Sequence, residues 1–302
     1  MSLDNPTQPE LSSLKPPLET NPAFAWKDQP KPRQGVIVTD LDGTFLDRTT
    51  YSPAASLPML RKALADGHIV VFCSSKTPSE QKHLQQTLGI QIPFICENGS
   101  ALYLPGKEFP ELEKKIEKNG DWLVIKLGLE FPKIDSILQS YEEENAANLG
   151  RMSQQPIKEL SSLTGLSEPA ALRARSRLFS ETLTAPLAES RKTHLTEYLY
   201  EEGLKFECGG RFHTVTSLGI NKGKAFKHLK GLLQTLRGDL LSIGLGDSEN
   251  DLRLLESVDF PVLVAKPDGT HEPVDLEPLH RNEKPGPHGW AATIETWLGV
   301  MA

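Results

Sequence analysis

The sequence predicts an α/β protein with a doubly wound, Rossmann-like parallel sheet and an inserted α+β cap domain. Three observations predict this fold. Short apolar, β-branched runs such as residues 36–38 and 69–73 are typical of parallel strands buried on both faces. Helical segments with recognisable caps alternate with these runs. About a hundred residues in the middle of the chain are more charged and less uniformly apolar, which indicates a separate layer.

Length and composition are those of an ordinary globular chain. The 302 residues correspond to roughly two domains of ~150 residues each. A formal net charge of −7 argues against general affinity for nucleic acid, and the longest apolar runs are too short to cross a bilayer. Three cysteines form no C-x-x-C pair, and the first ten residues hold no apolar leader. The predicted location is therefore a reducing cytoplasm.

The first 34 residues contain seven of the 23 prolines and show no hydrophobic period, which predicts a disordered tail. After this tail, strands and helices alternate. We expect, in order, a strand at 36–38, a helix between Ser52 and Gly67, a strand at 69–73, a helix from Pro78 to Gly89 and a strand at 93–96. The second helix has the clearest start, because Thr77 and Glu80 have the spacing of a capping box.

The middle of the chain has a different pattern. We expect strands or extended segments at 122–127, 181–183 and 204–216, and helices at 132–148, 156–163, from 167 onward and at 187–202. The first pattern then returns, with a helix at 222–236, strands at 240–245 and 261–264 and a helix at 291–298. These changes predict a core domain at 35–103 and 213–302, interrupted by a cap domain at 104–212.

Polar side chains gather where the predicted core strands end or a core helix begins. They are Asp40, Asp42, Ser74, Lys222, Asp247 and Asp251. Ligands of open parallel sheets bind at the carboxyl ends of the strands, so these side chains are expected at one edge. Four carboxylates cannot lie together without a cation, and carboxylate oxygens are natural Mg²⁺ ligands. The pattern predicts a metal site that holds a phosphate.

Each of these residues also has an ordinary structural explanation. Aspartate and glycine after a strand are common turn formers, Asp247 could cap a helix, and Lys222 alone could be a surface lysine. Their occurrence together, each after a separate strand or at the start of a helix, favours phosphatase chemistry over chance.

Residues 40–44, Ser74, Lys222 and residues 246–251 resemble the four motifs of the haloacid-dehalogenase-like phosphatases. The resemblance covers residues 35 to about 300. About thirty residues separate the first two motifs, whereas about 150 separate Ser74 from Lys222. The insertion therefore lies between the second and third motifs, as in the sugar-phosphatase branch with a large α/β cap.

Finer details resemble the mannosyl-3-phosphoglycerate phosphatase family within that branch. The matching segments are 73–77, 97–99, 163–167, 210–212 and 285–290. One position departs from the pattern: family members tend to carry a histidine three residues after Arg211, where this chain has Thr214. His213 stands one residue earlier, and one step along a strand reverses the face.

The resemblance implies phosphoryl transfer in two halves. Asp40 would attack phosphorus, and Asp42 would protonate the leaving oxygen and later accept a proton from water. Ser74 and Lys222 would bind the phosphoryl oxygens. The implied cofactor is Mg²⁺, and the residues assigned to it are Asp40, Asp42 (through its backbone carbonyl), Asp247 and Asp251, the last more as an orienting residue than as a direct ligand.

The resemblance also implies a small-molecule sugar phosphate as the partner, mannosyl-3-phosphoglycerate, with mannosylglycerate and phosphate as products. Lys76, Asn98 and Arg211 are the predicted substrate-binding residues, and the guanidinium of Arg211 suits a carboxylate. Glucosyl-3-phosphoglycerate and a sucrose-phosphate-like ester stay open as substrates. The alternative from another functional class is a catalytically silent binding module on the same fold. The intact pair of Asp40 and Asp42 disfavours this alternative.

Overall fold

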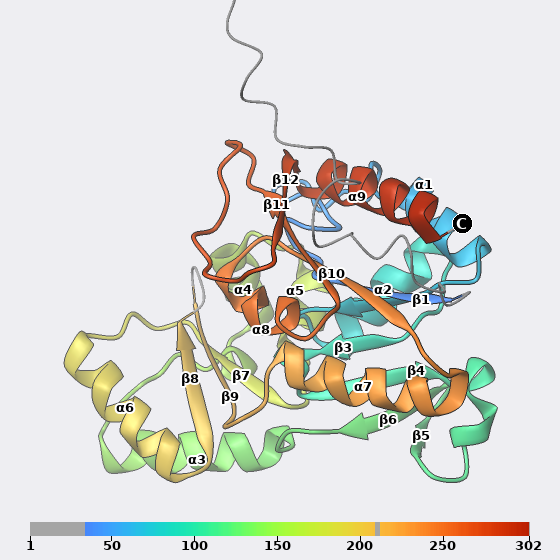
Figure 1. Cartoon of the computed structure of the whole chain (residues 1–302). Coiled ribbons are helices and arrows are strands. Elements are labelled where there is room, and N and C mark those ends of the chain that lie inside the picture. Colours follow the sequence, from blue (N-terminus) through green and yellow to red (C-terminus); the bar gives the residue numbers. More distant parts are fainter. Residues whose placement is uncertain (1–33, 209–211, 302) are drawn as a thin grey trace, which may run out of the picture.

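The structure, a computed structural model, describes residues 34–208 and 212–301 (Figure 1). The predicted tail, except its last residue, lies outside the described residues. A nine-stranded sheet runs through the larger part of the fold. Its order is β12 (His280–Pro285), β11 (Phe260–Ala265), β10 (Leu241–Gly246), β1 (Gly35–Thr39), β2 (Ile69–Cys73), β3 (Phe94–Cys96), β4 (Ala101–Pro105), β6 (Trp122–Lys126) and β5 (Glu117–Asn119).

The six strands from β12 to β3 pair in parallel, and β4, β6 and β5 extend the sheet with antiparallel pairs. All six parallel strands therefore end at the same edge. Two of these ends are close neighbours, because Thr39 of β1 stands in register with Leu245 of β10.

Apolar clusters cover both faces of this sheet. Alternate residues of β1 belong to different clusters: Ile37 packs with Trp290 and Trp297 on one face, while Val36 and Val38 pack on the other. The helices on the first face are α1 (Leu57–Ala65), α2 (Pro78–Leu88) and α9 (Gly286–Met301), and those on the second are α7 (Lys222–Arg237) and α8 (Leu252–Leu255). The predicted doubly wound α/β class is confirmed.

A smaller antiparallel sheet lies apart from the first (Figure 1). Its order is β7 (Ser180–Leu183), β9 (His213–Ser217) and β8 (Leu204–Cys208). Helices α3 (Phe131–Glu144) and α6 (Glu189–Glu201) share an apolar cluster with one face of this sheet. Helices α4 (Ile157–Thr164) and α5 (Glu168–Arg175) complete this part, which we call the cap; short 3₁₀ turns lie at 97–99, 106–108, 110–112, 152–154 and 249–251.

The strand pairing differs from the predicted domain boundaries at 104 and 213. Strands β4, β6 and β5 join the main sheet, although residues 104–126 were assigned to the cap. Strand β9 is the central strand of the small sheet, although the core was expected to resume at residue 213. An apolar antiparallel strand has the same local pattern in either sheet, so its sequence alone does not assign it to one of them.

Two helices differ in extent, β4, β5, β12 and the short α8 were not predicted, and the extended segment expected at 204–216 corresponds to two strands, β8 and β9. The first helix begins at Leu57 instead of after Ser52, because residues 53–56 form a turn in which the Leu57 amide donates to the Pro53 carbonyl at 2.9 Å. The last helix is longer than the predicted 291–298. Strand β12 was not predicted, because its sequence is polar and it lies at the edge of the sheet.

The capping box predicted for the second helix is confirmed. The Glu80 amide donates to Thr77 Oγ1 at 3.1 Å, and the Thr77 amide donates to Glu80 Oε2 at 2.8 Å. Among the helices of the described residues, none combines the length and the apolar character that spanning a membrane requires.

Candidate active site

Two acidic residues follow neighbouring parallel strands. Asp40 comes directly after β1 and Asp247 directly after β10. The Asp40 amide donates to the Leu245 carbonyl at 2.9 Å, which continues the parallel pairing beyond the end of β1. Gly246 makes room for the site, since a Cβ there would lie 2.4 Å from Cβ of Asp251.

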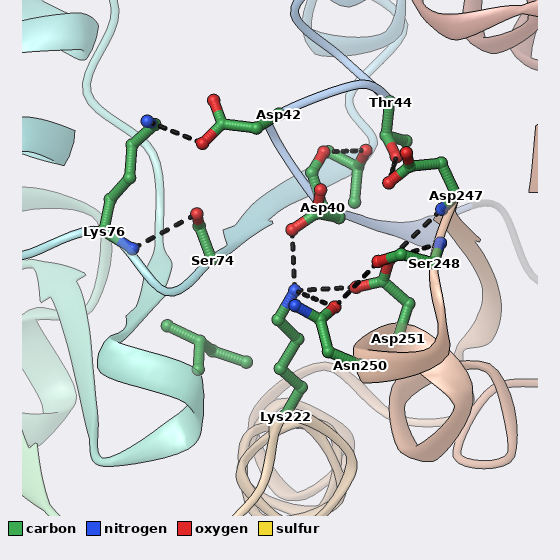
Figure 2. Close-up of polar contacts among 12 residues, drawn as sticks. Asp40, Asp42, Thr44, Ser74, Lys76, Lys222, Asp247, Ser248, Asn250 and Asp251 are labelled. Atoms are coloured by element: carbon green, nitrogen blue, oxygen red, sulfur yellow. Dashed lines mark hydrogen bonds and ion pairs between the residues drawn. The ribbon is translucent and has the colours of Figure 1, made fainter. Parts of the chain in front are cut away.

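Three buried carboxylates meet at this edge. One oxygen each from Asp40, Asp247 and Asp251 lies within 4.8 Å of the others. Backbone geometry holds Asp251 in place, because its Oδ2 accepts hydrogen bonds from the amides of Asp247 and Ser248 at 3.1 and 3.2 Å. The structure thus brings together three of the four predicted metal-site residues (Figure 2).

Lys222 opens α7 and inserts a buried ammonium group between these carboxylates. Its Nζ donates to Asp40 Oδ1 and to Asp251 Oδ1, both at 2.6 Å (Figure 2). Asn221 caps the helix by accepting a hydrogen bond from the Lys224 amide. Gly223 allows the close approach of α7 to α8, because a Cβ at this position would lie 1.8 Å from the Arg253 carbonyl oxygen.

The electrostatics of the cluster follow from three buried carboxylates that face one buried ammonium group. Burial, then repulsion from Asp251, raises the pKa of Asp40 well above its ordinary value, although Lys222 opposes this. Burial and Asp251 likewise raise the pKa of Asp247. Burial alone would lower the pKa of Lys222, but Asp251 and Asp40 together outweigh it and raise that pKa. The cluster holds more negative charge than Lys222 can balance.

The donor set suits a divalent cation. Asp40 and Asp247 offer carboxylate oxygens in a buried position, and such oxygens are the ligands that Mg²⁺ prefers. Both oxygens of Asp251 accept hydrogen bonds from buried groups of the fold, Lys222 on one side and backbone amides on the other. The oxygens of Asp247 are contacted by Thr44 and by Arg48, and the Arg48 side chain is 47% exposed, so a metal ion would have to displace only this exposed guanidinium group. The cluster could therefore bind a metal ion mainly through Asp40 and Asp247.

The side chain of Asp42 lies outside the carboxylate cluster. Its Oδ2 pairs with Lys76 Nζ at 2.7 Å, and its Oδ1 is buried without a hydrogen-bond partner. Figure 2 shows Asp42 and Lys76 on the side of Asp40 away from Asp247. Burial would lower the pKa of Lys76, but Asp42 and Glu80 raise it overall. The structure thus brings together the predicted acid–base residue and one predicted substrate-binding residue.

Ser74 and Asn98 follow the next two strands, β2 and β3. Ser74 is buried, its Oγ accepts a hydrogen bond from the Lys76 amide at 3.3 Å, and its carbonyl accepts from the Asn98 amide at 3.2 Å. Asn98 has a φ of 58°, and its Oδ1 is buried without a partner. Both residues lie at the predicted sheet edge. Arg211, the third predicted substrate-binding residue, lies outside the described residues.

Three further residues contribute to the site but were not among the predicted site residues. Arg48 contacts Asp247 through its guanidinium group, and Thr44 Oγ1 donates to the same carboxylate at 3.3 Å. Glu97 reaches from the end of β3 to the cap, where it accepts hydrogen bonds from the amides of Leu178 and Phe179 at 2.9 and 3.0 Å. An acidic residue directly after a core strand was a usable signal for Glu97, whereas Arg48 stands in a loop with no recognisable pattern.

Comparisons with known proteins agree on one family. A family model described as haloacid dehalogenase-like hydrolase matches residues 37–154. A glucosyl-3-phosphoglycerate/mannosyl-3-phosphoglycerate phosphatase from Methanococcoides burtonii is 32% identical over 87% of this chain and 97% of its own length. A protein of the same name from Persephonella marina is 33% identical over 86% of this chain and 95% of its own. A mannosyl-3-phosphoglycerate phosphatase from Pyrococcus furiosus is 33% identical over 76% of this chain and 90% of its own.

Solved structures share the fold at low sequence identity. A protein from Thermoplasma acidophilum superposes with a TM-score of 0.62 at 15% identity, over 88% of this chain and 99% of its own. A haloacid-dehalogenase-superfamily phosphatase from Bacteroides thetaiotaomicron has a TM-score of 0.60 at 15% identity, over 96% of this chain and 99% of its own. These structures show the fold, and the sequence relatives place the chain among the haloacid-dehalogenase-like hydrolases, in the branch that holds the mannosyl- and glucosyl-3-phosphoglycerate phosphatases.

Proposed function

We propose that this chain is a Mg²⁺-dependent phosphatase that hydrolyses mannosyl-3-phosphoglycerate to mannosylglycerate and phosphate. The observation that carries the proposal is the ammonium group of Lys222, which joins Asp40 to Asp251 beside Asp247 at the end of two parallel strands. Such a site offers a nucleophilic carboxylate, a fixed positive charge and oxygen ligands for a metal. The names of the relatives support the substrate class.

In the first half of the reaction, a carboxylate oxygen of Asp40 attacks phosphorus and the bond to the leaving sugar-acid oxygen breaks. Asp42 gives that oxygen its proton, which leaves an aspartyl phosphate on Asp40. Lys222 holds the attacking carboxylate at 2.6 Å, and together with Ser74 it binds the phosphoryl oxygens. Lys76, paired with Asp42, holds the acid–base residue beside the leaving group.

In the second half, Asp42 takes a proton from water, the water oxygen attacks phosphorus, and the bond from Asp40 to phosphorus breaks. Phosphate leaves and the carboxylate of Asp40 is restored. Bound Mg²⁺, held by Asp40, the backbone carbonyl of Asp42 and Asp247, would neutralise charge on the phosphoryl oxygens. Asp251 positions Lys222 for both halves.

The cap is proposed to cover the substrate and to read its leaving group. Lys76 and Asn98 on the core and Arg211 on the cap are the proposed contacts with the glycosyl and glycerate parts. Mannosyl and glucosyl esters differ at one hydroxyl group, and the names of two relatives include both. We therefore propose glucosyl-3-phosphoglycerate as the alternative substrate.

Phosphate release from a panel of esters tests the proposal. The panel contains mannosyl- and glucosyl-3-phosphoglycerate, sucrose 6-phosphate and p-nitrophenyl phosphate, each with Mg²⁺ and with a chelator. We expect rapid release from a glycosyl-3-phosphoglycerate only with Mg²⁺, and a loss of at least about 10³-fold in Asp40→Asn. Release from no ester would favour a silent binding module, and an Asp40→Asn variant with more than about a tenth of the normal rate would exclude this nucleophile.

A further inference from the structure

One face of the cap sheet is lined by polar side chains. Successive residues of a strand point to opposite faces, and the pairing of β7, β9 and β8 brings alternate residues of the three strands onto a shared face. We call this the cap polar face; its residues are Ser180, Thr182, Lys205, Glu207, Thr214 and Thr216. The opposite face carries Leu183, Leu204 and Val215, which pack in one apolar cluster with α3 and α6.

The cap polar face is turned toward the core. Its opposite face is already occupied by α3 and α6, so the pairing of the strands directs the polar residues away from these helices. Ser180, at one end of the face, donates from Oγ to Glu97 Oε2 at 2.5 Å, and Glu97 directly follows core strand β3. Ser180 thus lies next to Glu97, whose own amide donates to the Lys76 carbonyl in the candidate active site at 3.1 Å.

Two hydroxyl groups on this face are buried without a partner. Thr182 is 4% exposed and Thr216 is 1% exposed, and Oγ1 of each makes no hydrogen bond. Ser180 stands in register with Thr216, so the two threonines are diagonal neighbours on adjacent strands and lie roughly 5–8 Å apart. A buried hydroxyl without a partner destabilises a fold, so a pair of them on one face indicates a ligand that supplies the missing hydrogen bonds.

The chemistry of the face selects the kind of ligand. Each threonine hydroxyl can both donate and accept, which matches the hydroxyl groups of a sugar, whereas an ionised phosphate or carboxylate would use only the donor. Lys205 and Glu207 form an ion pair at the β8 edge of the same face and so offer one further donor and acceptor. An apolar leaving group would leave the two threonines unpaired.

We propose that the cap polar face binds the glycosyl unit of the substrate, and that Thr182 and Thr216 are specificity-determining residues that hydrogen-bond its hydroxyl groups. This inference rests on the proposed function, because it assigns the glycosyl half of that substrate to one surface. The phosphoryl half stays at Asp40, at the ends of the core strands.

Isosteric substitution tests the inference. In Thr182→Val and Thr216→Val, the ratio of kcat/KM for the glycosyl-3-phosphoglycerate to that for p-nitrophenyl phosphate is expected to fall about tenfold or more, mainly through KM. The melting temperature of the free variants is expected to rise, since each loses an unpaired buried hydroxyl. Thr182→Ser and Thr216→Ser should restore the ratio. Thr196→Val, on the exposed side of α6, is the matched control and should keep the wild-type ratio.

Two outcomes would overturn the inference, and they are distinguishable. Valine variants that keep the wild-type ratio while their melting temperatures rise would identify the threonines as purely structural. A wild-type enzyme that hydrolyses p-nitrophenyl phosphate but no glycosyl ester would overturn the proposed substrate and this inference with it.

Discussion

Lys222 shows why a single residue can matter more for the site than for the stability of the fold. Its side chain is 2% exposed, and its ammonium group lies between two carboxylates. Burying such ions costs about as much free energy as their attraction returns, so the group adds little net stability. Its value lies in position, because it holds Asp40 and Asp251 in fixed places and opposes the rise in the pKa of Asp40 that burial and Asp251 cause.

Different effects on metal affinity are expected from the two aspartates that follow β10. Asp247→Asn should abolish measurable Mg²⁺ or Mn²⁺ binding, since it removes a proposed ligand. Asp251→Asn should weaken binding by only about 10–100-fold, because Asp251 acts through Lys222 and through backbone amides. Isothermal titration calorimetry of the metal-free protein measures both. The reverse order of affinities would contradict the assignment of the ligands.

At the scale of elements, local sequence patterns were sufficient to predict a helix or strand where the surroundings of that element are uniform. Strand β2 is apolar throughout because both of its faces are buried, and α2 starts at a capping box that is complete within four residues. Strand β12 has no such pattern, because a polar edge strand is stabilised by its neighbour β11 more than by its own burial. Strand β6 belongs to the main sheet because it pairs with β4. The local sequence of β6 does not indicate which strand is its partner.

The residues of the candidate site also fall into two groups, those that a local sequence pattern predicts and those that depend on contacts between distant parts of the chain. Asp40, Ser74 and Asp247 could be predicted because each directly follows a recognisable strand. Arg48 acts through its contact with Asp247, which is distant in sequence, so only the folded structure reveals it. Glu97 directly follows β3 and could have been noted, but its contact with Leu178 of the cap could not. The pairing of Asp42 with Lys76 depends on the loops after β1 and β2 and was not predicted either.

The start of α7 gives a prediction at this scale. In Gly223→Ala the new Cβ would lie 1.8 Å from the Arg253 carbonyl oxygen, so α7 and α8 must move apart and carry Lys222 away from Asp40. We expect a loss of about 1–3 kcal/mol in the free energy of unfolding and at least about a hundredfold loss in kcat. Urea unfolding and phosphate release measure the two effects.

The same helix offers the matched control. Gly231 is exposed on α7, and a Cβ there would meet nothing within 4 Å. Gly231→Ala should therefore stabilise the protein by about 0.5–1 kcal/mol with wild-type kcat. Equal effects of the two alanines would show that close packing at Gly223 does not position Lys222.

At the scale of the whole molecule, Glu97 connects the two parts of the fold. Its backbone amide donates to the Lys76 carbonyl on the core, and its buried carboxylate accepts three hydrogen bonds from residues 178–180 of the cap. Arg177 adds a second connection, because its Nη1 donates to the Ser75 carbonyl at 3.4 Å. The loop that carries Ser74 and Lys76 is thus held from both sides, by β3 and by the cap.

This junction predicts a pH-dependent stability. Burial raises the pKa of Glu97, and its effect exceeds those of Arg177 and of the hydrogen bonds from Ser180 and the cap amides, which lower it. In the unfolded chain Glu97 has an ordinary pKa. At a pH between the unfolded and the folded pKa, Glu97 therefore binds a proton when the chain folds. The contribution of Glu97 to stability is therefore fully present below the unfolded pKa and is lost as pH rises through the folded pKa.

The Glu97→Gln variant isolates this effect, because glutamine does not titrate and keeps nearly the same shape. Urea unfolding of both proteins from about pH 4 to about pH 8 gives the difference in free energy of unfolding, wild type minus variant. We expect this difference to fall as pH rises above the unfolded pKa of a glutamate and to level off once the folded pKa is passed. A difference that rises with pH over this range would mean that the cap amides and Arg177, not burial, dominate at Glu97, and that its charged form is what holds the cap on the core.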